Sequence, residues 1–215
     1  MVQAIIFGFI GFLLCFLMEY LSIYLTKKKC IKHEVVNSEK KMDIKIKYAL
    51  YILHITLWAF IGFKVDNIYL ALLISFLLSL ALLISRIDLG IHIIPNELVL
   101  TMIVIGILLQ LVSFDLKSFL IAIGCMIGMG ALFLITAAVI GFDKVGAGDV
   151  KLAGAIGLVL GYPDILTALI AMSAAMILYC AIGFSAYKLT LRSMLPFAPF
   201  MMIGMISGLI SNLIA

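Results

Sequence analysis

Long apolar runs separated by short polar segments constrain the fold of this chain more than any other feature. A helix needs about 20 apolar residues to cross roughly 30 Å of hydrocarbon. The composition agrees, because 66% of the 215 residues are hydrophobic and 12% are charged. The sequence therefore predicts an all-α polytopic membrane protein with about eight transmembrane helices. The runs cover residues 2–25, 48–63, 68–87, 97–113, 118–140, 152–162, 165–187 and 197–214.

The run at residues 152–162 is short for a full crossing, so it could also be a re-entrant segment. Divided by its runs, the chain has three predicted parts. Residues 1–67 hold two N-terminal spans, residues 68–205 hold a core, and residues 206–215 complete the last span.

The only long polar segment, residues 26–47, indicates the orientation of the chain. Loops rich in lysine and arginine lie in the cytosol, so we expect a cytosolic loop here and the N-terminus outside. The net charge of +4 then reflects insertion into a cytoplasmic membrane rather than binding of nucleic acid. Basic residues assigned to inner segments are Lys27, Lys28, Lys29, Lys32, Lys40, Lys41, Lys45, Lys47, Arg86, Lys144, Lys151, Lys188 and Arg192, against Lys64 and Lys117 outside.

Two aspartates lie at the ends of apolar runs, where a carboxylate costs about 2.5–3.5 kcal/mol and is usually functional. Asp88 follows the third run, and Asp149 ends a Gly146-Ala147-Gly148-Asp149 segment before the sixth. Two spans separate them, so both should reach the cytosolic face. One of two neighbouring carboxylates can take a proton from water while the other polarises a carbonyl group. The alternative is two unrelated acids that pair with Arg86 and Lys151.

Three motifs follow one another in the chain: Asp88 with Ile94-Pro95-Asn96, Gly146-Ala147-Gly148-Asp149 with Lys151-Leu152, and Leu195-Pro196-Phe197-Ala198-Pro199-Phe200. Together they resemble the type IV prepilin peptidase family of G-x-G-D intramembrane-type aspartic proteases. The resemblance covers roughly residues 68–205. It implies that Asp88 and Asp149 are the catalytic pair. It also implies prepilin or pseudopilin substrates, whose short basic leader is removed at the cytosolic face.

The other candidate site residues are supporting ones. Glycine permits a tight turn or close backbone approach, and a proline favours a helix start just after it. Lys151 either tunes the proton affinity of the pair or anchors a helix at the headgroups. His92 is expected to be an incidental loop residue. The supporting residues are Gly146, Gly148, Lys151, Pro95, Asn96, Pro196, Phe197 and Pro199.

The cysteines separate this chain from the longer bacterial relatives that it resembles. Those relatives carry paired C-x-x-C motifs that bind zinc, and they methylate the mature pilin with S-adenosylmethionine. Residues 26–47 hold only Cys30, so we expect no metal site. Proteolysis should need no cofactor, and S-adenosylmethionine would be used only if methyltransfer is retained.

Two other classes of protein are alternatives. A presenilin-like intramembrane protease shares the G-x-G-D pattern but should carry a proline-alanine-leucine stretch near its end, where this chain has Pro196-Phe197-Ala198-Pro199. A proton-coupled transporter usually places its acids near mid-membrane in broken helices, whereas both aspartates here lie at the ends of runs. The sequence leaves the individual substrate and the oligomeric state open.

A labelling experiment tests the orientation. Cys30 should react with a membrane-impermeant thiol reagent in inverted vesicles and not in intact cells, because its segment is assigned to the cytosol. Mass spectrometry of the labelled peptide is the measurement. Labelling of Cys30 in intact cells would reverse the topology.

Overall fold

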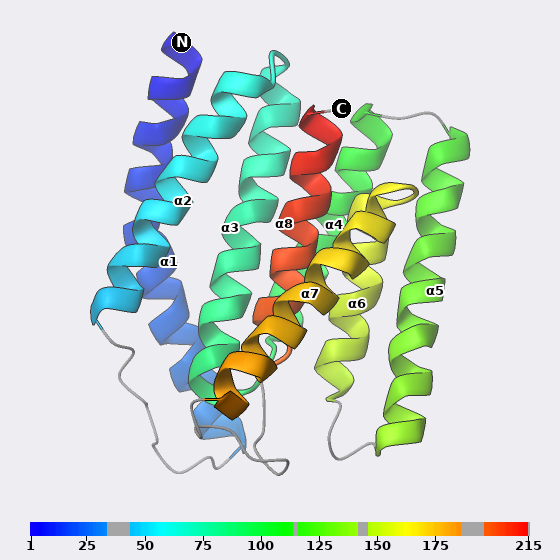
Figure 1. The fold of residues 1–215 in the computed structure, drawn as a ribbon. Coiled ribbons are helices and arrows are strands. Elements are labelled where there is room, and N and C mark those ends of the chain that lie inside the picture. The colour runs from blue at the N-terminus through cyan, green and yellow to red at the C-terminus, as the bar shows by residue number, and fades with distance from the viewer. Residues whose placement is uncertain (34–43, 114–115, 142–145, 186–195, 215) are drawn as a thin grey trace.

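The computed structural model describes residues 1–33, 44–113, 116–141, 146–185 and 196–214, and every regular element in these parts is a helix (Figure 1). The prediction of an all-α fold is therefore confirmed. The eight helices are α1 (Val2–His33), α2 (Ile44–Lys64), α3 (Ile68–Ile91), α4 (Asn96–Ser113), α5 (Leu116–Ile140), α6 (Ala147–Leu160), α7 (Asp164–Ser185) and α8 (Ala198–Ile214).

Five of these helices, α1, α2, α3, α5 and α7, are long and apolar enough to cross a membrane. Helices α4 and α8 are shorter apolar helices, and α6 has 14 residues. The chain thus has the helices of a multi-pass membrane protein. Eight complete crossings, and an N-terminus outside, stay predictions.

The basic segment at residues 26–47 was expected to be a loop, and that prediction is wrong at both ends. Helix α1 continues through residues 26–33, and α2 already begins at Ile44. Lysine is a good helix former, and no glycine or proline interrupts these residues, so the helices continue past their apolar parts. Residues 34–43 lie outside the described parts of the chain.

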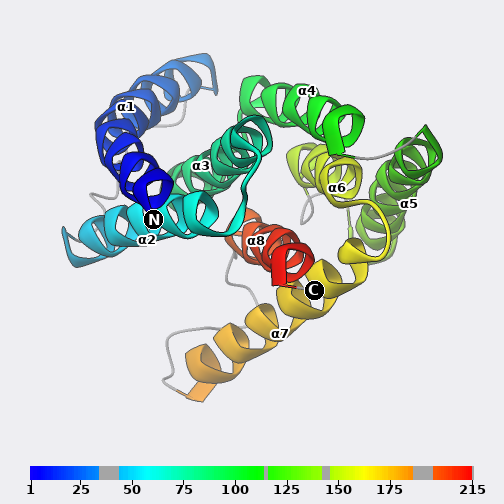
Figure 2. The ribbon, with the colours of Figure 1, turned by 90° about the horizontal axis from the view of Figure 1, so that it is seen from above.

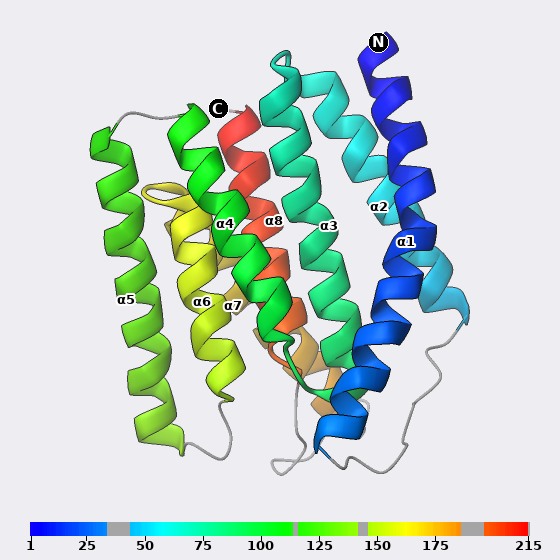
Figure 3. The same ribbon diagram turned by 180° about the vertical axis from the view of Figure 1, so that it is seen from behind.

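The helices alternate in direction, and both termini lie at one end of the bundle (Figures 1 and 3). The opposite end, called the site end below, is where α3 ends and α4, α6 and α8 begin. These four helices form the centre of the bundle, where α3 contacts α4 and α8, and α6 contacts the same two (Figure 2). Helices α1 and α2 pack beside α3, α5 packs on α6, and α7 packs on α8.

Two of the outer helix pairs are held together through glycines. A Cβ atom at Gly157 of α6 would lie 2.5 Å from the carbonyl oxygen of Cys125 in α5. One at Gly204 of α8 would lie 2.5 Å from the carbonyl oxygen of Ala168 in α7. Small residues let helix backbones approach closely where van der Waals contact drives association in lipid. These glycines therefore set the distance of α5 and α7 from the central helices.

Replacing Gly157 by alanine should destabilise the protein. The new methyl group would press on the backbone of α5, which cannot move aside by a rotamer change, and overpacking of this kind costs about 1–3 kcal/mol. Thermal unfolding of the purified protein measures the effect. Gly124→Ala is the matched control, because a Cβ atom at Gly124 of α5 has nothing within 4 Å. Equal unfolding temperatures for the two variants would contradict the packing argument.

Candidate active site

Asp88 lies in the last turn of α3 at the site end, with 4% of its surface exposed. Its Oδ2 atom accepts a hydrogen bond of 3.1 Å from the backbone N–H of Ala198, the first residue of α8. The N-terminus of a helix carries a partial positive charge and free N–H groups. The start of α8 therefore supplies both a donor and a favourable field to a buried carboxyl group.

The backbone after Asp88 explains why α3 ends there. His92 adopts a left-handed conformation with φ 53°, and its N–H donates to the carbonyl oxygen of Asp88 at 2.9 Å. Pro95 disfavours helical geometry at Ile94, and its own carbonyl oxygen accepts the N–H groups of Leu98 and Val99 as α4 begins. The side chain of His92 is exposed, and the residue caps α3 through its backbone N–H.

Asp149 is the third residue of α6 and is half-buried at the same end. Its Oδ2 atom accepts a hydrogen bond of 3.0 Å from the N–H of Gly146, the N-cap residue. An acidic side chain in the first turn also interacts favourably with the helix dipole. Asp149 is therefore stabilised by the N-terminus of its own helix, α6. Asp88 is stabilised by the N-terminus of another helix, α8.

The segments that carry the two carboxyl groups are in contact, because a Cβ atom at Gly148, next to Asp149, would lie 3.1 Å from Cβ of Ile94 in the turn after Asp88. The sequence placed each aspartate just outside an apolar run, and the structure places both inside helix ends. Because α3 runs toward the site end and α6 runs away from it, the last turn of one helix and the first turn of the other lie at the same end. The structure thus places at one end of the bundle the two acids that the sequence had paired, and their action as a pair stays a prediction.

The three sequence motifs meet around this pair. A Cβ atom at Gly148 would lie 3.1 Å from Cβ of Ile94, so the glycine lets α6 approach the turn between α3 and α4. The ammonium group of Lys151 donates to Oδ1 of Asn96 at 3.4 Å, which joins the same two segments again. The hydrogen bond from Ala198 to Asp88 brings in the third motif.

The remaining predicted residues surround this core of contacts. Pro95 is buried, and Asn96, Gly146 and Lys151 are exposed. Pro196, Phe197 and Pro199 are half-buried at the start of α8, where the carbonyl oxygen of Phe197 accepts the N–H groups of Phe200 and Met201. The helix start that the sequence predicted at these prolines is confirmed by α8, which begins at Ala198. Leu195 lies outside the described residues.

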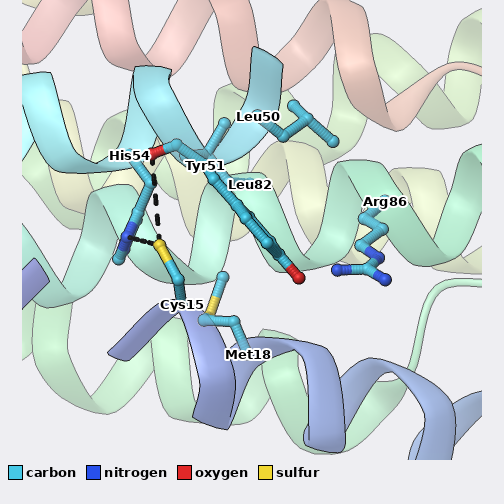
Figure 4. Close-up of a pocket in the computed structure, with 7 residues that line it drawn as sticks. All are labelled: Cys15, Met18, Leu50, Tyr51, His54, Leu82 and Arg86. Carbon is cyan, nitrogen blue, oxygen red and sulfur yellow. Dashed lines mark hydrogen bonds between the residues drawn. The ribbon is translucent and has the colours of Figure 1, made fainter. Parts of the chain in front are cut away.

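Sequence reasoning missed a polar cluster between α1, α2 and α3. A small cavity there is lined by Tyr51, Arg86 and the buried His54, among others (Figure 4). The ring of His54 lies 2.8 Å from Oγ of Ser79 and 3.3 Å from Sγ of Cys15. Polar residues such as His54 and Glu19 inside apolar runs were the signal that could have revealed this cluster.

No metal site was expected from the spacing of the cysteines and histidines. Within the residues described, no three side chains of histidine, cysteine, aspartate or glutamate gather into a group that could hold a metal ion. Cys15, Cys30, Cys125 and Cys180 are free thiols, with Cys15 buried and the other three half-buried.

A multi-pass helical bundle with two carboxyl groups at one end is an arrangement that membrane peptidases and proton-coupled transporters can both use. The type IV leader peptidase family model matches residues 74–182, which is about half of the chain and includes both aspartates. The chain belongs to the type IV leader peptidase family, as the motifs predicted. Comparisons with curated proteins and with solved structures find no match.

The contact between Gly148 and Ile94 can be tested by a pair of substitutions. Gly148→Val should slow peptidase activity about 10- to 100-fold, because a small displacement of catalytic groups is costly. Adding Ile94→Ala should restore part of the rate by making room for the new side chain. Ala147→Val is the control, since Ala147 is exposed in the same turn. A Gly148→Val enzyme with full activity would show that the close approach is unnecessary.

Proposed function

We propose that this protein is a membrane-embedded aspartic endopeptidase that removes the short basic leader from type IV prepilins or pseudopilins. The observation that supports it best is the placement of Asp88 and Asp149 at one end of the bundle, where all three motifs meet in a member of the leader peptidase family. The family supports a peptidase that acts on prepilin-type substrates. The aspartic mechanism and the membrane face are our proposals.

The chemistry follows from the pairing of the two acids. Two neighbouring carboxyl groups share a proton and titrate as one unit. The charged carboxylate takes a proton from a water molecule, and the oxygen of that water attacks the scissile carbonyl carbon. The neutral carboxyl group donates a hydrogen bond to the carbonyl oxygen. Breakdown of the tetrahedral intermediate then returns a proton to the departing amine. This sequence consumes only water and needs no cofactor.

The cytosolic face is proposed for the site end because basic residues gather there. Lys27, Lys28, Lys29, Lys45, Lys47, Arg86 and Lys151 lie toward that end, whereas Lys64 and Lys117 lie toward the other. Positive residues favour the cytosolic side. Five of the other inner-face candidates, Lys40, Lys41, Lys144, Lys188 and Arg192, lie outside the described residues.

The proposed partners are a prepilin or pseudopilin substrate and the lipid bilayer, without nucleic acid. N-methylation of the mature pilin stays doubtful, because residues 26–47 hold one cysteine rather than paired C-x-x-C motifs. S-adenosylmethionine enters the scheme only if that second activity is retained.

Substitution of the two aspartates tests the proposal. Asp88→Asn and Asp149→Asn should each lower cleavage at least 10²- to 10⁴-fold, the usual contribution of general acid–base catalysis. The double variant should lose little more, because removing one member already disables the unit. Co-expression with a candidate prepilin, followed by a gel mobility shift, is the measurement.

The matched control is Asp66→Asn, since Asp66 is an exposed aspartate in the turn between α2 and α3 at the opposite end. It should cleave at the normal rate. A correctly inserted Asp88→Asn or Asp149→Asn protein that still cut prepilin at near-normal rate would exclude the pair and the aspartic mechanism with it.

A further inference from the structure

Helix α1 is joined by ion pairs to both sides of the turn that follows Asp88. This turn, residues 92–95, is called the site turn below. Before it, Nη2 of Arg86 in α3 lies 3.9 Å from Oε1 of Glu19 in α1. After it, Oε2 of Glu97 in α4 lies 3.0 Å from Nζ of Lys29 in α1. Figure 3 shows the lower part of α1 reaching the region where α3 ends and α4 begins.

The pair between Lys29 and Glu97 is the more demanding of the two. The side chain of Lys29 is only 9% exposed, and a buried ammonium group is costly unless a counter-charge meets it. Lys28 also reaches Glu97 at 3.5 Å, but its side chain is 53% exposed, so that contact contributes little. Glu97 therefore holds the end of α1 against the start of α4 mainly through Lys29.

The pair on the other side belongs to a larger cluster. Glu19 accepts hydrogen bonds from Lys47 and from the hydroxyl group of Tyr51, both on α2, besides its contact with Arg86. The side chain of Arg86 is 16% exposed. Arg86 precedes Asp88 by two residues on α3, so this cluster restrains the rotation of the helix end that carries the aspartate.

The site turn passes this restraint on to the second aspartate. Ile94 in the turn packs against Gly148, and Asn96 just after it accepts the hydrogen bond from Lys151. Both contacts are made by the first two turns of α6, which also carry Asp149. A displacement of the site turn would therefore change the position of Asp149 relative to Asp88.

We infer that α1 is a positioning element of the peptidase, in which Glu19 and Lys29 fix the two sides of the site turn and so set the separation of Asp88 and Asp149. The inference rests on the proposed function and deepens it. Helix α1 lies outside residues 74–182, which match the family, so its contribution adds to what the family supplies.

Charge exchange in the purified full-length protein tests this inference. Lys29→Glu and Glu97→Lys should each lower kcat for prepilin cleavage at least tenfold while changing KM less than about threefold, because they displace catalytic groups rather than the substrate. The combined Lys29→Glu and Glu97→Lys protein should recover to within about threefold of the original kcat. Lys27→Met, at an exposed position two residues away, should have no effect.

A second measurement does not depend on activity. Cysteines placed at Asn96 and Lys151 should be joined efficiently by a short bifunctional thiol reagent, and mass spectrometry identifies the joined peptide among those of the native cysteines. The yield should fall at least threefold in Lys29→Glu, return in the charge-exchanged protein and stay unchanged in Lys27→Met. Thermal unfolding of each variant establishes that it is folded.

The outcomes separate this inference from the proposed function. If the single charge variants keep normal kcat and normal crosslinking, α1 does not position the site, and the Asp88 and Asp149 variants still judge the peptidase mechanism. If the charge-exchanged protein is folded but recovers neither measurement, the ion pair is not the restraint. If prepilin is never cut, the crosslinking yields alone decide whether α1 holds the site turn.

Discussion

The site depends on holding two carboxyl groups where a membrane protein has little water to stabilise them. Asp88 is almost fully buried, and a buried polar group without a hydrogen bond is costly. The N–H of Ala198 at the start of α8 meets it, and the N–H of Gly146 at the start of α6 meets Asp149. Helix N-termini are suited to this task because their first N–H groups have no partner inside the helix.

This requirement explains the order of helices around the site. One helix must arrive with Asp88, and others must begin beside it to offer free N–H groups. Helices α4, α6 and α8 all begin at the site end, while α3 ends there. The glycines at Gly148, Gly157 and Gly204 allow the close approach of neighbouring segments that this arrangement needs, because a Cβ atom at each would meet another segment at 3.1 Å or less. The absence of a Cβ atom thus serves both the packing of α5 and α7 at Gly157 and Gly204 and the arrangement of the candidate site at Gly148.

Much of this site could be predicted from the sequence, because its signals are local. Apolar runs predicted the helices, and the proline before Asn96 predicted the start of α4. The number of spans between them then placed both aspartates on the same side of the membrane. The extension of α1 through residues 26–33 could not be predicted in this way, because a hydropathy pattern ends at the first lysines whereas helical hydrogen bonding does not. That extension carries Lys29 to Glu97.

By itself the sequence determined the class of fold and the family, since these follow from composition and from motifs of a few residues, and it singled out the two aspartates as candidates. Only the tertiary structure decided which hydrogen-bond donor or counter-charge each buried polar side chain meets. The donor to Asp88 comes from Ala198, 110 residues away in the chain, and the partner of Arg86 is Glu19 on the first helix. Such contacts depend on how helices pack and rotate against one another. Those rotations are set by many small side-chain contacts at once, and no short stretch of residues encodes them.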